Sequence, residues 1–304
     1  MGSVAFVFSG QGAQYTGMGK DLYDNNPAAK AVFDRLEAIR PGTLAQCFEA
    51  DIQELSQTVN TQPCMFAVEL AAAAALTETG VRCGRTAGFS LGEIAALTFS
   101  GAVDLETGFR LVCRRGELMQ AAAQAVDSGM AAVVKLTDEQ VKELCAGFEH
   151  VYPVNYNCPG QVAVAGLTVE LKEFTAAVKQ AGGRAIPLKV RGGFHSPFMD
   201  GAARAFAAEL QDIAFAAPEI PLYSDYTAEP YAGDFAELLS KQICNPVQWT
   251  GIVRHMIAAG TDTFLELGPG KTLCGLIAKI DPSVRVLHVE NCESLRQAVE
   301  ESLC

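Results

Sequence analysis

The chain has 304 residues, 49% of them hydrophobic, and a formal net charge of −12. This length allows one large domain or two unequal ones, and the composition is typical of a globular α/β core. The acidic balance argues against a general nucleic-acid binder, although it leaves room for a small basic patch. The longest apolar stretch, residues 70–76, is too short to span a bilayer, so we expect no membrane segment.

The ten cysteines are scattered along the chain and form no Cys-x-x-Cys pair. This spacing argues against zinc-ribbon and thioredoxin-like sites, and we expect no metal site. Most of the cysteines lie among apolar residues, which favours small core side chains in a reducing cytoplasm. The N-terminal residues lack a basic region followed by a long apolar run, so we expect no signal peptide and a cytoplasmic location.

The first predicted elements are a strand, a loop and a helix. Residues 4–8 are continuously apolar, which predicts a buried parallel strand, and a tight glycine loop follows at 10–14. Thr61 and Pro63 predict the start of a helix with Thr61 as its N-cap. The residues at 64–76 are apolar almost all round, so this helix is expected to be buried.

The next motif is a glycine–serine pattern that carries chemical information. Gly88, Ser90 and Gly92 form Gly-x-Ser-x-Gly, the pattern of a nucleophile elbow between a strand and a helix. The glycines permit the tight turn, and the serine Oγ then projects above the N-terminus of the helix predicted at 93–99. Unpaired N–H groups at a helix N-terminus favour a developing negative charge there.

The segment 128–191 changes to a β-α-β-β-α-β order, the split unit of ferredoxin-like domains. Its predicted elements are residues 130–136, 137–146, 151–157, 161–166, 168–181 and 184–188. Helices at 202–210 and 250–260 and strands at 222–223, 263–267 and 284–289 follow. We therefore predict an α/β fold. An α/β-hydrolase-like large domain with a parallel sheet comprises residues 1–127 and 192–304, and the ferredoxin-like small domain, 128–191, is inserted into it.

A serine nucleophile needs a base, and His195 is the candidate among the four histidines. It lies where the chain leaves the small domain, with two glycines before it and Pro197 after it, and loops at domain junctions often line clefts. The other three histidines suit structural or surface roles. We find no acidic residue between Ser90 and His195 in a strand-end loop, so a backbone carbonyl is left as a partner for the imidazole Nδ1–H.

Arg115 is unusual because of its place on a helix predicted to follow an Asp104 cap. The residues at 105, 109, 112, 116, 119 and 123 form one face of this helix, which is apolar apart from a glycine. Arg114 falls opposite this face and is expected to be solvated, whereas Arg115 falls at its flank among apolar neighbours. A guanidinium in such surroundings needs an anionic partner. An internal carboxylate and a ligand carboxylate are both open alternatives.

Two glycine loops, at 10–12 and 268–270, differ from phosphate-binding motifs. Tyr15 and Leu273 stand where a dinucleotide fingerprint needs glycine, and neither loop has a P-loop ending. We therefore expect no cofactor. The loop after the first strand is better explained as a backbone N–H donor that faces the nucleophile and forms an oxyanion hole with the amide of Leu91.

Seven motifs together resemble one family, the malonyl-CoA:acyl carrier protein transacylases and the related acyltransferase domains of polyketide synthases. The resemblance covers nearly the whole chain. The motifs are FSGQGAQ at 8–14, GFSLGE at 88–93, RG at 115–116, NCPGQ at 157–161, GFHSP at 193–197, NPVQW at 245–249 and ELGPG at 266–270. One departure is Phe89, where the family often has histidine; that position is not expected to take part in the chemistry.

The resemblance implies a role for each matching residue. Ser90 is the nucleophile and His195 the general base. The backbone amides of Gln11 and Leu91 form the oxyanion hole. Arg115 holds the malonyl carboxylate in a bidentate pair.

Two further residues take roles from the resemblance. Gln248 orients the histidine through its main-chain carbonyl. Phe194 resembles the malonyl-selective pattern, because a bulky ring there would crowd an α-methyl branch, although one methyl group changes selectivity by only about 1–3 kcal/mol.

The implied reaction is transfer of a malonyl group from malonyl-CoA to the phosphopantetheine thiol of an acyl carrier protein, through a serine ester, by a monomer without a cofactor. A serine hydrolase or thioesterase and a non-catalytic carrier-protein-binding module are the alternatives. Fatty acid and polyketide synthesis are both open. Lys189 and Arg191 are candidates for a basic patch that meets the acidic carrier protein, or else ordinary solvated charges.

Overall fold

The computed structural model describes residues 3–303 and contains two four-stranded sheets. The first sheet is parallel, with the order β2-β1-β7-β8. Its strands are β1 (Ser3–Phe8), β2 (Arg85–Gly88), β7 (Thr261–Leu267) and β8 (Arg285–Val289). The predicted strands at 4–8, 263–267 and 284–289 are confirmed. Because residues 5–8 of β1 are fully buried on both faces of the sheet, this strand is a continuous apolar run.

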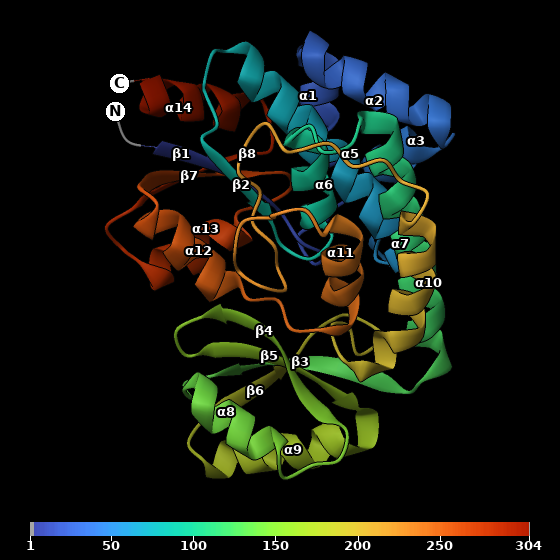
Figure 1. Ribbon diagram of the computed structural model, residues 1–304, viewed down its shortest axis with the longest axis vertical. Coiled ribbons are helices and arrows are strands. Elements are labelled where there is room, and N and C mark those ends of the chain that lie inside the picture. The colour runs from blue at the N-terminus through green and yellow to red at the C-terminus, as the bar shows by residue number, and fades with distance from the viewer. Residues whose placement is uncertain (1–2, 304) are drawn as a thin grey trace.

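Helices cover both faces of the parallel sheet (Figure 1). Phe6 and Phe8 pack into a core with α5 and α6, whereas Ala5 and Val7 face α12 and α13. The helices outside the small domain are α1 (Lys20–Asn25), α2 (Pro27–Ile39), α3 (Thr43–Phe48), α4 (Ile52–Leu55), α5 (Thr58–Glu78), α6 (Gly92–Phe99), α7 (Leu105–Ala125), a 3-10 turn (Pro197–Met199), α10 (Asp200–Leu210), α11 (Phe235–Cys244), α12 (Trp249–Ala258), α13 (Thr272–Ile280) and α14 (Cys292–Leu303).

Capping hydrogen bonds explain two of these helix starts. Asp104 caps α7 as predicted, because its Oδ1 accepts the Thr107 N–H at 2.7 Å. The predicted start of α5 at Thr61 is wrong by three residues, since the helix begins at Thr58. The side chain of Gln120 on α7 accepts the Val59 N–H at 3.0 Å, so a contact distant in sequence provides the cap.

The second sheet is antiparallel, with the order β4-β5-β3-β6. The elements are β3 (Ser128–Val134), α8 (Asp138–Cys145), β4 (Val151–Cys158), β5 (Gln161–Leu167), α9 (Thr168–Gln180) and β6 (Arg184–Pro187). Their order is the predicted β-α-β-β-α-β unit, and all of them lie within residues 128–191. Both helices cover one face of the sheet (Figure 1). The fold class is therefore confirmed: α/β, with a parallel sheet and a separate antiparallel sheet.

Backbone pairing joins the two parts. The N–H of Tyr156 on β4 donates to the Val247 carbonyl, and the Val247 N–H donates to the Val154 carbonyl, both at 2.9 Å. Figure 1 shows α12 and α13 between the parallel sheet and β4. The small domain therefore lies against the segment 245–249, close to the carboxyl end of α11.

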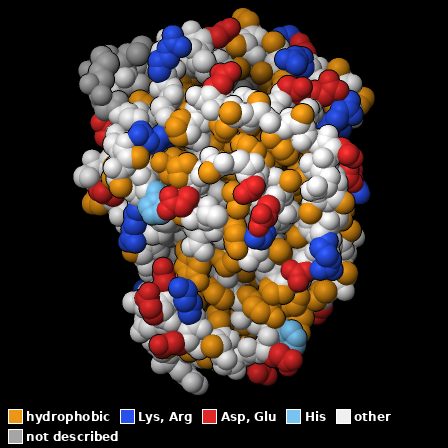
Figure 2. All heavy atoms as spheres, viewed as in Figure 1, with side chains coloured by type: hydrophobic (Ala, Val, Ile, Leu, Met, Phe, Trp, Pro, Cys, Tyr) orange, Lys and Arg blue, Asp and Glu red, His pale blue; other side chains and the backbone are white. Residues whose placement is uncertain are grey.

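Acidic and basic side chains are interspersed on the face shown in Figure 2. Within residues 3–303, no helix combines the length and the apolar character needed to cross a membrane. The nine cysteines of the same range are free thiols.

Candidate active site

Ser90 lies at a sharp turn between β2 and α6, with a left-handed φ of 56°. A Cβ on Gly88 would lie 1.9 Å from the Gly92 carbonyl, and a Cβ on Gly92 would lie 2.5 Å from the Phe8 carbonyl oxygen. Only glycine fits at either position, because the backbone of the turn passes directly over itself and over β1. The predicted elbow is therefore present, and the strained φ of Ser90 is held by its surroundings.

His195 reaches the nucleophile from the loop that leaves the small domain. Its Nε2 lies 2.7 Å from the Ser90 Oγ, and its ring is 3% exposed. Nδ1 lies 2.8 Å from a backbone carbonyl, which only accepts, so Nδ1 carries the proton and Nε2 is free to accept one. Burial, with the nearby Arg115 charge, lowers the pKa of His195 to about 4, so the imidazole is neutral at neutral pH.

The structure corrects the residue that orients this histidine. We predicted the carbonyl of Gln248, but His195 Nδ1 donates to the carbonyl of Gln242. The Gln248 carbonyl is occupied, because it accepts the Ile252 N–H in the first turn of α12. The Gln242 carbonyl has no partner within the helix and can therefore accept from His195. Its helical partner would be the N–H four residues on, and Pro246 has no N–H.

The Gln242 side chain also contacts the site, which the sequence did not predict. Its Nε2 donates to the Ser90 carbonyl at 2.6 Å, and its Oε1 accepts from Arg115 Nη2 at 2.7 Å. Gln242 thus connects the nucleophile, the base and the arginine. A polar residue four positions before a proline at a helix end is the sequence signal that would have found it.

Arg115 is 1% exposed, and its Nη2 lies 3.3 Å from the Ser90 Oγ. Nη2 also donates to Gln242, whereas Nε and Nη1 are buried without a hydrogen-bond partner among residues 3–303. Burial lowers the pKa of Arg115 to about 10, which leaves it charged at neutral pH. Arg114 lies on the outer side of α7 and pairs with surface glutamates, as its position on the helix predicts.

The remaining predicted residues lie around this centre. A Cβ on Gly10 would lie 2.7 Å from the Phe89 ring, so the loop with Gln11 packs directly against the elbow. No hydrogen bond within residues 3–303 uses the N–H of Gln11 or of Leu91. Phe194 is buried beside the histidine at 6% exposure.

An acidic residue that the sequence did not single out completes the elbow. Asp225, fully buried in the loop before α11, accepts the Ser90 N–H at its Oδ2, at 2.6 Å. Both main-chain polar groups of Ser90 are therefore held by side chains, the N–H by Asp225 and the carbonyl by Gln242.

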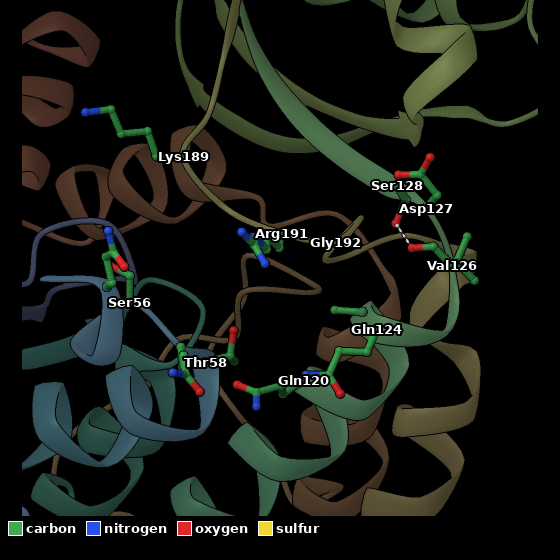
Figure 3. A pocket seen from close by; sticks show the side chains of 13 residues that line it. Ser56, Thr58, Gln120, Gln124, Val126, Asp127, Ser128, Lys189, Arg191 and Gly192 are labelled. Carbon is green, nitrogen blue, oxygen red and sulfur yellow. Dashed lines mark hydrogen bonds between the residues drawn. The ribbon is translucent and has the colours of Figure 1, made fainter.

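A groove of about 1010 Å³ lies beside the Gln11 side chain, and Ser90, His195 and Arg115 are not among the residues that line it. It is lined by the turn before α5, by the end of α7 and by the two segments that connect the domains, 126–128 and 189–192. Thr58, on its wall, accepts from Gln11 Nε2 at 3.4 Å, so the groove leads to the loop beside the nucleophile. In Figure 3 the Arg191 side chain lies over the groove, whereas the Lys189 amine extends away from Thr58 and Gln120.

A serine at an elbow, hydrogen-bonded to a neutral imidazole beside two free backbone amides, defines an enzyme of the serine acyl-transfer class. The Acyl transferase domain family matches residues 5–295, and the chain belongs to this family. It is 34% identical to the malonyl CoA-acyl carrier protein transacylase of Bacillus subtilis, over 99% of this chain and 97% of that protein.

Solved structures agree with this assignment. The crystal structure of malonyl CoA-acyl carrier protein transacylase from Clostridium perfringens superposes with a TM-score of 0.95 at 38% identity, over 98% of this chain and 96% of that one. A malonyl-transacylase in complex with its type II polyketide synthase acyl carrier protein has a TM-score of 0.94 at 33% identity, covering 98% of this chain and 99% of that one.

Proposed function

We propose that this acyltransferase moves a malonyl group from malonyl-CoA to the phosphopantetheine thiol of an acyl carrier protein. The observation that carries the proposal is Arg115, whose buried Nε and Nη1 have no partner within residues 3–303 while Nη2 touches the Ser90 Oγ. A buried guanidinium with two free donors is suited to a carboxylate, and here it lies where the acyl chain of a serine ester would lie.

The reaction proceeds in two half-reactions. His195 Nε2 takes the proton from Ser90 Oγ, which attacks the thioester carbonyl carbon. The negative charge that develops on the carbonyl oxygen is stabilised by the N–H groups of Gln11 and Leu91. The C–S bond breaks, the imidazolium returns the proton to the CoA sulfur, and malonate remains as an ester on Ser90. The carrier-protein thiol then attacks this ester by the same steps in reverse, with His195 as base.

The surroundings of the site suit the two substrates of a thioester exchange. The groove beside Thr58 has room for a phosphopantetheine arm, and Arg191 over it is suited to the phosphates or acidic groups of the incoming partner. Phe194 next to the base narrows the space for an α-methyl branch. We further propose a monomer that acts in the cytoplasm, in fatty acid or polyketide synthesis.

Mass spectrometry tests this function. Malonyl-CoA should add one malonyl group to the wild-type chain, mapped to Ser90, and none to Ser90→Ala. A holo acyl carrier protein should then remove the group and gain the same mass. Release of free malonate in place of transfer would identify a thioesterase, and the absence of any adduct would indicate a binding module. Carrier proteins of the fatty acid and polyketide types distinguish the two pathways.

A further inference from the structure

Two buried carboxyl groups and one buried guanidinium surround the elbow. Glu93 in the first turn of α6 and Asp225 are fully buried, and Arg115 is 1% exposed. The Asp225 N–H donates to Glu93 Oε1 at 3.1 Å, so the two carboxyl groups belong to one cluster. Asp225 Oδ2 holds the Ser90 N–H, and Arg115 touches the Ser90 Oγ.

The charges in this cluster do not balance when every group is ionised. Two carboxylates and one guanidinium give a net charge of −1 in a buried cluster, and a substrate carboxylate would bring it to −2. Burial of uncompensated charge is costly, so the cluster must take up a proton. One oxygen of each carboxyl group, Asp225 Oδ1 and Glu93 Oε2, has no hydrogen-bond partner within residues 3–303, which leaves a place for that proton.

The pKa shifts of the two carboxyl groups favour the uptake of this proton. Burial and the nearby Glu93 carboxylate raise the pKa of Asp225 well above its usual range, and burial raises the pKa of Glu93 to about 7. Like-charged carboxyl groups that interact closely titrate as a pair.

We propose that Asp225 is a positioning residue for the nucleophile, and that it shares one proton with Glu93 so that Arg115 keeps its charge for the substrate carboxylate. This inference rests on the proposed malonyl transfer. Asp225 fixes the strained backbone at Ser90 through the N–H. The shared proton makes the free cluster neutral, so the incoming carboxylate meets a guanidinium opposed by one negative charge and not by two.

The groups that face the pair determine how pH acts on it. They are Arg115 from α7, Tyr231, whose hydroxyl donates to Glu93 Oε1 at 2.6 Å, and His195 beside the arginine. Burial and the Glu93 charge raise the pKa of Tyr231 well above its usual range, so it stays neutral, as does His195 at neutral pH. Rising pH therefore removes the shared proton before any neighbour titrates, and malonyl binding weakens.

Single-turnover acylation of Ser90 by malonyl-CoA tests this proposal without the carrier-protein thiol. In the wild type, we expect the half-saturation constant to rise between pH 7 and pH 9, by at most about tenfold per pH unit, because the binding-competent form loses one proton. The inhibition constant of acetyl-CoA, which has the same CoA phosphates but no carboxylate on its acyl group, should stay flat over this range. A flat malonyl profile, or an equal rise for acetyl-CoA, would overturn the proposal.

Two conservative variants separate the shared proton from the positioning role. Asp225→Asn keeps an oxygen for the Ser90 N–H but leaves one carboxyl group, so the rise with pH should disappear, as it should in Glu93→Gln. Asp225→Ala removes the acceptor, so the acylation rate at saturating malonyl-CoA should fall far more than in Asp225→Asn. A wild-type pH slope in Asp225→Asn, or equal rates in the two Asp225 variants, would contradict the assignment.

An infrared difference spectrum between wild type and Asp225→Asn at neutral pH reports the proton directly. It should contain the C=O stretch of an un-ionised carboxyl group. Because this measurement needs no substrate, a missing band overturns the shared proton even if acylation is observed. Conversely, a band without any malonyl adduct on the wild type would overturn the proposed function and leave the shared proton standing.

Discussion

The two domains bury different kinds of side chain. The parallel-sheet part buries six acidic, arginine or histidine side chains, which are Glu69, Glu93, Arg115, His195, Asp225 and Glu266. In residues 128–191, all of which the structure describes, the buried side chains are apolar except those of Asn155 and Asn157. Burying charge is costly, and four of these six side chains, those of Glu93, Arg115, His195 and Asp225, lie around Ser90. The small domain, by contrast, contributes Ser128, Lys189 and Arg191, near its two ends, to the lining of the groove.

The largest expected effect is on the base of the large domain. Replacing His195 with alanine removes the proton acceptor 2.7 Å from Ser90 Oγ, so acylation should slow by about 10²–10⁴-fold. Quenched-flow mass spectrometry of the Ser90 adduct measures this. His255→Ala, on the exposed side of α12, is the control and should acylate like the wild type. A loss of less than about tenfold in His195→Ala would mean that another group takes the proton.

A substitution in the small-domain core should act on stability alone. Phe174 on α9 is fully buried, and Phe174→Ala should lower the free energy of unfolding by about 3–5 kcal/mol, measured in urea. The malonyl-over-acetyl preference of the folded protein should not change, because no charge of the site is touched. Val169→Ala, exposed on the same helix, is the matched control. A changed malonyl-over-acetyl preference in Phe174→Ala would show that the small-domain core also affects selectivity.

One buried carboxyl group of the large domain, that of Glu69, should lower the free energy of unfolding. Both oxygens of Glu69 are buried without a hydrogen-bond partner within residues 3–303, and burial raises the pKa of Glu69 well above its usual range. Glu69→Met should therefore raise the free energy of unfolding by about 1–3 kcal/mol. The folded state favours the protonated form of Glu69, so the wild type loses stability as pH rises from about 4.3 towards the folded-state pKa. The stabilisation by Glu69→Met should therefore increase over the same rise in pH.

The exposed Glu78→Met on the same helix is the control for this substitution and should leave the free energy of unfolding nearly unchanged. If Glu69→Met were destabilising at every pH, Glu69 would have a stabilising partner, and the contrast between charged and apolar cores would weaken.

The smallest expected effect concerns the carbonyl that orients His195. Pro246→Ala supplies an N–H that competes with His195 for the Gln242 carbonyl. The hydrogen bond that orients the imidazole should weaken by about 1 kcal/mol, which lowers the acylation rate about fivefold. Pro282→Ala, at an exposed proline outside the site, should show no change. Unaltered acylation in Pro246→Ala would mean that the carbonyl serves both donors without cost.

Local patterns explain which parts of the fold could be predicted. The strands of the small domain and the continuous apolar strand β1 follow from hydropathy, and Asp104 caps α7 from three residues away. The glycines at 88 and 92 identified the elbow because their requirement is steric and local. Ser90, His195 and Arg115 were found because each stands in an unusual local setting.

The other site residues depend on contacts distant in the sequence. Asp225 holds the Ser90 N–H across 135 positions and Gln242 its carbonyl across 152, and no local pattern marks either pairing. Helix α11 was not predicted, so the free carbonyl at its end was not considered and Gln248 was preferred. The start of α5 was misplaced for the same reason, because its cap comes from Gln120 on another helix.

The proposed function depends above all on buried Arg115 binding the substrate carboxylate. The most direct measurement is acylation of Ser90 in an equimolar mixture of malonyl-CoA and acetyl-CoA, read as the ratio of the two adduct masses in wild type and Arg115→Ala. We expect the malonyl-over-acetyl ratio to fall by about 10²-fold in the variant, because a buried charge-assisted pair is lost. An unchanged ratio, with both adducts reduced equally, would contradict it and make Arg115 a structural residue.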